Sequence, residues 1–205
     1  MPADEAITLD MLLWAYARGI FPMADHRNGE IGWFAANPRA VLPLDQFKAS
    51  HSLRQRIRRG DYEIRTDTAF AQVIRNCAQP RKTQKETWIN DQIIEAFIEA
   101  HEQGFAHSVE AWTKPKDAAE QPRLVGGLYG LHLGGAFFGE SMFSTATDAS
   151  KVCLHHLVDH LKSRGFALLD VQMNSAHMAQ FGTIDIPREE YEAQLATVIE
   201  MEVFW

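Results

Sequence analysis

The stretch from residue 124 to residue 143 reads LVGGLYGLHLGGAFFGESMF. Its two apolar runs, 124–133 and 136–143, are separated by Gly134-Gly135, a pair suited to the positive φ angles of a tight turn. The stretch therefore predicts a β-hairpin. Further glycines lie inside both runs, and they indicate bulges or a ligand that approaches the strand backbone closely.

Helix-like and strand-like segments surround the hairpin and predict an α/β domain. The expected strands span 62–65, 107–112 and 166–173, and the expected helices begin at Thr8, Asp67, Asn90, Asp148 or Ser150, and near Pro187. Elements in this order build a mixed sheet with flanking helices. The triplet Asn37-Pro38-Arg39 interrupts the pattern, so we expect a small N-terminal lobe over 1–37 and a main domain over 38–205.

The composition is typical of a folded protein. The 205 residues are 46% hydrophobic, which is enough to bury one substantial core. No apolar run approaches the ~20 residues that cross a bilayer, and residues 1–5 are acidic where a secretory signal is basic. Cys77 and Cys153 occupy apolar-periodic positions, as buried thiols do in a reducing compartment. We therefore expect a cytoplasmic protein without a membrane segment.

Basic residues cluster in one region, although the formal net charge of the chain is −7. That charge argues against nucleic-acid binding over the whole surface, but a few positioned side chains are enough to contact phosphates. The cluster consists of Arg54, Arg56, Arg58, Arg59, Arg81 and Lys82. It predicts either contacts with a polyanionic partner or the solvated faces of a helix and a loop.

Three motifs resemble known catalytic or ligand-binding motifs only in part. His156 and His160 have the spacing of a helical metal pair, but Leu157 stands where a zinc hydrolase carries glutamate. The glycines of 126–130 do not match the dinucleotide-binding pattern. Ser141 lacks the second glycine of a nucleophile elbow and lies within a predicted strand. We therefore expect no metal ion, no nucleotide fold and no serine nucleophile.

Asp170 and Gln172 are better candidates for chemistry. They lie two residues apart in an otherwise apolar strand, so period-two geometry predicts that both side chains share one face. Leu169, Val171 and Met173 are then expected to point the other way, into the core. A buried aspartate is costly unless it is hydrogen-bonded or functional, so the pair is either catalytic or structural.

Eight segments distributed along the chain form a recognisable set. They are 16–22, 37–42, 87–89, 107–112, 124–130, 138–144, 148–151 and 169–172. In this order they resemble the leucyl/phenylalanyl-tRNA–protein transferase family. The resemblance implies a small N-terminal lobe and a larger, mixed-sheet domain of the GCN5-related N-acetyltransferase (GNAT) type, with flanking helices.

The resemblance also implies an activity. The family moves Leu or Phe, and less well Met, from aminoacyl-tRNA to proteins that begin with Arg or Lys, and thereby marks them for degradation. Because the acyl donor is the RNA ester, no cofactor is expected. The partners expected for this chain are aminoacyl-tRNA and such acceptor proteins or peptides, and the chain is expected to act as a monomer.

The resemblance assigns roles to individual positions of this sequence. The catalytic aspartate and glutamine fall on Asp170 and Gln172, which are expected to hold the acceptor amine and relay its proton, while Glu140 places the aminoacyl group. The amino-acid pocket falls on Leu128, Phe137, Met142, Leu157 and Leu161. Trp88 falls where the terminal adenosine stacks, and the basic cluster is expected to contact the phosphates of the tRNA.

The sequence departs from the family pattern in places. Met23 stands beside the predicted adenosine site where tryptophan is usual, residues 34–37 read FAAN, and a Gly-rich N-terminal extension has no counterpart. Two alternatives remain open: a related transferase that acts on a cell-wall peptide or a small amine, and a non-catalytic tRNA-binding protein. The presence of Asp170, Gln172 and Glu140 together favours an enzyme.

Overall fold

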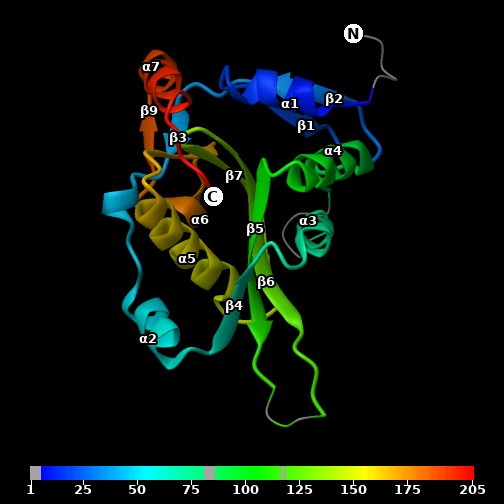
Figure 1. Ribbon diagram of the computed structural model, residues 1–205, viewed down its shortest axis with the longest axis vertical. Helices are drawn as coiled ribbons and strands as arrows, with labels where there is room; N and C mark the ends of the chain where they lie inside the picture. The colour runs from blue at the N-terminus through cyan, green and yellow to red at the C-terminus, as the bar shows by residue number, and fades with distance from the viewer. Residues whose placement is uncertain (1–5, 81–85, 116, 118) are drawn as a thin grey trace.

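The computed structural model describes residues 6–80, 86–115, 117 and 119–205, and it is built around one large mixed sheet (Figure 1). Two strands form a separate hairpin, β1 (Phe21–Ala24) with β2 (Ile31–Phe34). The large sheet has the order β4-β5-β6-β7-β8-β3-β9. Its strands are β3 (Arg39–Val41), β4 (Tyr62–Thr66), β5 (Ala106–Thr113), β6 (Leu124–Leu133), β7 (Ala136–Ser144), β8 (Leu168–Gln172) and β9 (Ile184–Ile186).

Helices cover both faces of this sheet, which confirms the expected α/β class. They are α1 (Leu9–Tyr16), α2 (His51–Arg59), α3 (Phe70–Cys77), α4 (Asp91–Glu102), α5 (Ala149–Arg164), α6 (Ala176–Ala179) and α7 (Arg188–Val198), with a 3-10 turn at Leu44–Gln46. One apolar cluster joins the sheet to α5 and to Leu53 of α2. A second cluster joins its other face to α1, α3, α4 and α7. Figure 1 accordingly shows α5 on one side of the sheet and α3 and α4 on the other.

The predicted hairpin is confirmed as β6 and β7, joined at Gly134-Gly135. Gly134 has a φ angle of 51°, and a Cβ atom there would lie 2.3 Å from the carbonyl oxygen of Ile199. Only glycine combines this backbone conformation with so close an approach. The turn is therefore determined both by local conformation and by the packing of the chain that follows α7.

Several helix boundaries follow from local capping. The Thr8 hydroxyl accepts a hydrogen bond from the Met11 amide, and the Asn90 side chain accepts one from the Ile93 amide, as N-caps do. The α3 helix lacks such a local cap. The amides of the two residues just before it, Thr68 and Ala69, instead donate to the buried carboxylate of Glu110 on β5.

The parallel pair β7 and β8 is the feature that creates a site. The two strands pair only from Ala136 opposite Leu168 to Phe138 opposite Asp170, and beyond that point they have no further paired residues. The register of β7 against β6 also shifts here. Tyr129 pairs with Ser141 and Gly130 pairs with Gly139, so no residue of β6 pairs with Glu140. Glu140 is thus the extra residue of a β-bulge at the point where β7 leaves β8.

The segment that was expected to form an N-terminal lobe, and that is called the N-terminal lobe below, contains α1 and the β1–β2 hairpin. It lies across one end of the large sheet (Figure 1), and its apolar residues belong to one of the two core clusters. Two contacts attach it to the segment before α4. The Ala24 amide donates to the Trp88 carbonyl at 3.0 Å, and the Asn90 side chain donates to the Gly29 carbonyl at 3.2 Å. None of the helices in the described part of the chain combines the length and apolar character required to cross a membrane.

Candidate active site

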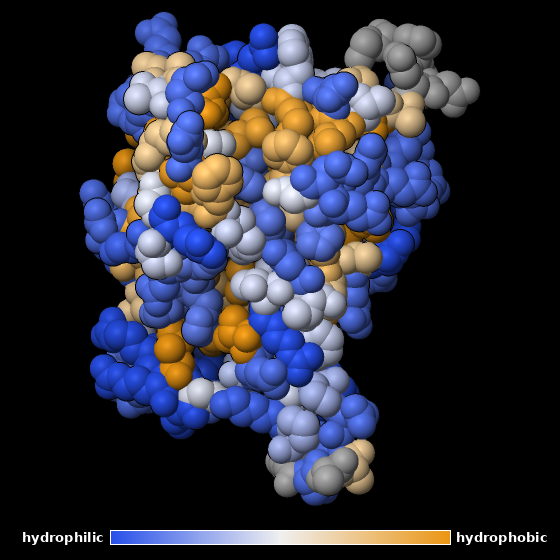
Figure 2. Space-filling model, viewed as in Figure 1, coloured by the Kyte–Doolittle hydropathy of each residue, from blue (hydrophilic) through white to orange (hydrophobic). Residues whose placement is uncertain are grey.

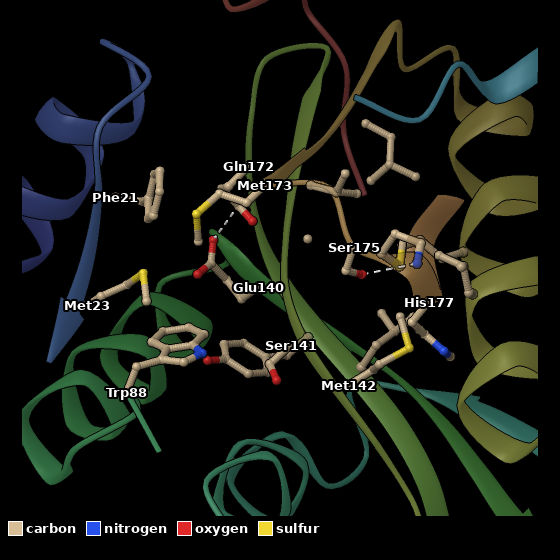
Figure 3. Close-up of a pocket in the computed structure, with 18 residues that line it drawn as sticks. Phe21, Met23, Trp88, Glu140, Ser141, Met142, Gln172, Met173, Ser175 and His177 are labelled. Atoms are coloured by element: carbon tan, nitrogen blue, oxygen red, sulfur yellow. Dashed lines mark hydrogen bonds between the residues drawn. The ribbon is translucent and has the colours of Figure 1, made fainter. Parts of the chain in front are cut away.

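A cavity of about 310 Å³ lies where β7 and β8 part, between the N-terminal lobe and the main domain. Figure 3 shows its lining, with Phe21, Met23 and Trp88 on one side and Met142 and His177 on the other. The volume is at the lower end of the range for sites that bind small molecules. The lining is mostly apolar, and its polar side chains lie on both sides, with Glu140 and Gln172 across from Ser175 and His177.

Glu140 and Gln172 are polar lining residues that contact each other. The Gln172 amide nitrogen donates to a Glu140 carboxyl oxygen at 3.1 Å, the dashed line between them in Figure 3. The bulge turns Glu140 toward the cavity, and a φ angle of 56° at Gln172 turns that residue out of the β8 strand. Burial raises the pKa of Glu140 from its ordinary 4.5 to about 8, and the opposing effect of the Tyr16 hydroxyl does not offset it.

Asp170 lies outside the cavity lining and is completely buried. The Arg39 guanidinium donates to both carboxylate oxygens, with Nε 3.0 Å from Oδ1 and Nη2 2.7 Å from Oδ2. The Tyr191 hydroxyl donates to Oδ2 at 2.6 Å, and the Gln172 backbone amide donates to Oδ1 at 2.8 Å. Asp170 is thus part of a buried ion pair. Its carboxylate, held by Arg39 and Tyr191, in turn fixes the backbone of Gln172.

The expected facing of strand β8 was correct only in part. Leu169 is 1% exposed and belongs to a core cluster, as expected, and Val171 packs against that cluster. Met173 is instead 53% exposed, and all three residues line the cavity. The register of β8 against β3 shifts between the pairs Gln172–Ala40 and Asp170–Val41, which leaves Val171 unpaired. This bulge and the left-handed conformation of Gln172 break the simple alternation on which the expectation was based.

Arg39 was not singled out from the sequence, although it holds the site together. Its side chain is 1% exposed, and its Nη1 atom donates to the Gly19 carbonyl at 2.7 Å. One guanidinium therefore joins Asp170 of the main domain to the N-terminal lobe. The signal for such a partner was the buried Asp170 itself, since a buried carboxylate requires a compensating charge or several donors.

The expected amino-acid pocket is only partly the cavity lining. Leu128, Met142 and Leu157 line it, whereas Phe137 and Leu161 are completely buried and do not. These two pack behind the wall, in the same apolar cluster as Leu128 and Leu157. Sequence reasoning missed several other lining residues, which are Leu154, Leu169, Val171 and Met178.

Trp88 and Met23 lie together at the wall nearest the N-terminal lobe, as Figure 3 shows. The hydrogen bond from the Ala24 amide to the Trp88 carbonyl fixes the tryptophan backbone next to strand β1. Phe21 of the same strand completes this wall. An indole at the edge of a cavity provides a flat surface on which a nucleic-acid base can stack.

Four arginines of the basic cluster lie on helix α2, at the end of the molecule opposite the N-terminal lobe (Figure 1), where Figure 2 shows a hydrophilic surface. These arginines are not equivalent. Arg56 forms ion pairs with Asp61 at 2.8 Å and Asp148 at 3.4 Å, and Arg59 forms one with Asp61 at 3.0 Å.

Arg54 and Arg58 are exposed, and neither forms an ion pair with any described residue. They are four residues apart, so they share one face of α2. Arg81 and Lys82, the other two members of the cluster, lie outside the described residues.

Three side chains of the described segments lie close enough to share a metal ion, namely Asp67, His101 and His107. Their polar atoms already have partners within the protein. His107 Nδ1 lies 2.8 Å from Asp67 Oδ2, and His101 Nδ1 lies 2.8 Å from the Ala106 carbonyl oxygen. These hydrogen bonds account for the cluster, which includes neither His156 nor His160.

Comparison with known proteins gives a consistent set of matches. The sequence model described as leucyl/phenylalanyl-tRNA protein transferase matches residues 41–196, and that of its N-terminal domain matches residues 5–37. The leucyl/phenylalanyl-tRNA–protein transferase of Chlorobaculum parvum is 48% identical over 97% of this chain and 99% of its own. That of Salinibacter ruber is 45% identical over the whole of this chain and 85% of its own.

Among solved structures, FemX resembles this chain with a TM-score of 0.51 and 11% sequence identity. The likeness covers 80% of this chain and 60% of FemX, and at this identity it concerns the fold alone. It agrees with the mixed α/β sheet that was expected from the sequence.

Proposed function

This chain belongs to the leucyl/phenylalanyl-tRNA–protein transferase family, and we propose that its cavity receives the aminoacyl end of the tRNA while the acceptor amine enters beside Gln172. The chain is an aminoacyltransferase, as the family resemblance in its sequence predicted. Different residues are proposed to bind the donor, orient the acceptor amine and exchange its proton. The observation that supports the proposal is the contact between Glu140 and Gln172 at the wall of a mostly apolar cavity.

The apolar part of the cavity suits the donor's side chain. Leu128, Met142 and Leu157 present aliphatic and thioether surface, without a charged group among them. A pocket of this kind selects by shape and burial, and a single methylene changes the binding free energy by only ~1–3 kcal/mol. Leu, Phe and Met are then all accepted, while a charged side chain is excluded because its desolvation is not compensated.

The terminal adenosine of the tRNA fits the wall formed by Trp88 and Met23. Stacking of a base on an aromatic side chain contributes ~1–3 kcal/mol, and it does not depend on which base is bound. Met23 supplies a polarizable but flexible contact where an indole would supply a second plane. The exposed Arg54 and Arg58 of α2 are the proposed contacts for phosphates more distant from the aminoacyl end.

The reaction is the aminolysis of an ester. The acceptor nitrogen forms a bond to the carbonyl carbon, the bond from that carbon to the ribose oxygen breaks, and the proton lost by nitrogen ends on that oxygen. An α-amine titrates near ~8, which is close to the pKa of about 8 that burial gives Glu140. A group matched in this way exchanges a proton with the amine at little cost in either direction.

In this arrangement Asp170 is a positioning residue. Its carboxylate accepts the Gln172 backbone amide, and its other bonds go to Arg39 and Tyr191. Gln172 orients the amine, Glu140 exchanges the proton, and Asp170 holds the backbone that places Gln172. Orientation of two reactants can supply several kcal/mol of the barrier on its own, and the ester is already activated.

We further propose that the acceptors are proteins or peptides whose N-terminal residue is Arg or Lys, and that the added residue marks them for degradation. The enzyme is proposed to act as a monomer in the cytoplasm. The test is transfer of labelled leucine from Leu-tRNA to an Arg-starting peptide, compared with the same peptide acetylated at its N-terminus. Transfer only to the free amine supports the proposal, and equal labelling of both peptides contradicts it.

A further inference from the structure

The sheet places Gln172 and Asp185 on one row across three strands. Ala40 of β3 pairs with Gln172 of β8 on one side and with Asp185 of β9 on the other. Neighbouring strands lie ~4.8 Å apart, so the Cα atoms of Gln172 and Asp185 are separated by about 10 Å. Since β9 is the edge strand of the sheet, Asp185 is exposed at the end of this row.

The carboxylate of Asp185 is also attached to the rim of the cavity. Asn174 donates to Asp185 Oδ2 at 3.2 Å, and the residues on either side of Asn174, Met173 and Ser175, both line the cavity. Asn174 is itself fixed, because its side-chain oxygen accepts the Ser175 amide at 2.9 Å and the Thr183 hydroxyl at 2.8 Å. The position of the carboxylate is therefore determined by the same short segment that forms the rim.

Asp185 differs in charge from the other two carboxyl groups of this region. Asp170 is buried and neutralised by Arg39, and the pKa of Glu140 is raised to about 8, so that at neutral pH it is mostly uncharged. Asp185, by contrast, is exposed and forms no ion pair with any side chain in the described segments. It is an exposed carboxylate whose charge no described side chain compensates, and it is hydrogen-bonded to the segment that carries Met173 and Ser175 of the lining.

We propose that Asp185 binds the cationic side chain of the acceptor's first residue, an inference that rests on the proposed function above. With the α-amine beside Gln172, a lysine or arginine side chain extends roughly 6 Å from its Cα atom, which brings its charged end within hydrogen-bonding reach of a carboxylate in the Asp185 position. The apolar stem of such a side chain packs on Met173, which is 53% exposed and lines the cavity.

The test compares two acceptor peptides that differ only in charge at the first residue, one starting with arginine and one with its neutral near-isostere citrulline. Exposed ion pairs contribute ~0.2–1 kcal/mol, so the wild type should prefer arginine by roughly 1.4- to fivefold in kcat/KM. Asp185→Asn should bring that ratio close to one, while the KM for Leu-tRNA stays unchanged. The asparagine keeps an oxygen for the Asn174 amide, so the rim remains intact.

Two further variants complete the test. Glu189→Gln removes an exposed carboxylate from the start of α7, away from the row, and should leave the ratio at its wild-type value. Asp185→Lys should reverse the ratio, so that citrulline is preferred. A purely structural role for Asp185 would lower transfer to both peptides equally and would not change their ratio.

The outcomes separate this inference from the proposed function. If the wild type transfers leucine to the arginine peptide, but neither Asp185 variant changes the ratio, Asp185 is not the recognition residue and the proposed function stands. If the wild type transfers leucine to neither peptide, the proposed function is overturned, and this inference with it.

Discussion

Replacing Asp170 with asparagine separates a positioning role from a chemical one. The substitution removes the charge but keeps the size of the side chain. It leaves the Arg39 guanidinium buried without its counter-charge, with one asparagine oxygen and the Gly19 carbonyl as acceptors. Removing one partner of a buried ion pair costs about 3–5 kcal/mol. Small domains are stable by ~5–15 kcal/mol, so the variant should still fold.

The expected thermal shift follows from that cost. For a chain of this length, each kcal/mol lowers the melting temperature by ~2–4 °C, so Asp170→Asn should melt roughly 10 °C below the wild type. Transfer should also slow, because the Gln172 backbone amide loses a charged acceptor. The matched variant is Gln172→Ala, which removes the cavity-facing amide, keeps the ion pair, and should slow transfer with little loss of stability.

Three measurements on the same preparations test this reasoning: urea unfolding, affinity for Leu-tRNA, and single-turnover transfer. A positioned proton acceptor contributes ~10²–10⁴-fold to a rate. If Asp170→Asn unfolds like the wild type and binds Leu-tRNA normally, yet transfers more than 100-fold more slowly, Asp170 takes part in the chemistry and the positioning role is refuted. The double variant Arg39→Met with Asp170→Leu should regain stability, because apolar residues can replace a buried pair.

Three further predictions concern separate parts of the site. Burial raises the pKa of Glu140 from 4.5 to about 8, so as the pH rises the carboxyl ionises in the unfolded chain before it ionises in the folded one. The free energy of unfolding should therefore fall by at most ~5 kcal/mol as the pH rises between these values. Glu140→Gln should remove that fall when unfolding is measured as a function of pH, and an unchanged pH dependence would contradict the assignment. Arg54→Ala and Arg58→Ala should each lower the slope of log tRNA affinity against log salt by roughly one unit, with a smaller effect for the ion-paired Arg56→Ala; unchanged slopes for both exposed arginines would place the phosphate contacts elsewhere. With tRNA charged with different amino acids, transfer of Leu, Phe and Met should be measurable while Asp is rejected, since Met142 and its neighbours offer no counter-charge; comparable rates for Asp would exclude this pocket.

The parts of the fold that could be predicted are those encoded by local sequence. The β6–β7 hairpin follows from two apolar runs around Gly134-Gly135, and the starts of α1 and α4 follow from the capping residues Thr8 and Asn90. Strand β9 was not predicted. It is three residues long, too short for a detectable alternation, and it forms by pairing with β3, a segment more than 140 residues earlier in the chain.

The site was predicted less completely, for a related reason. Period-two geometry holds for a regular strand, but two bulges interrupt it here, one at Val171 and one at Glu140. The partner of Asp170 is Arg39, 131 residues away, and no local pattern identifies a pairing over that distance. Apolar residues also look alike in sequence whether they line a cavity or pack behind it, which is why Phe137 and Leu161 could not be told apart from Leu157.

The point at which β7 and β8 separate explains why the ion pair and the proposed chemistry involve neighbouring but different residues. Asp170 is the last residue of β8 that pairs with β7, its charge is compensated by Arg39, and neither residue lines the cavity. The next polar residue, Gln172, is already turned toward the opening, where it meets Glu140. A fully ionised carboxylate in the cavity would also activate water, which would hydrolyse the ester. A mostly uncharged Glu140 instead favours the acceptor amine, because Gln172 holds that amine in place. The buried ion pair can therefore provide rigidity without exposing a strong base to the bound aminoacyl ester.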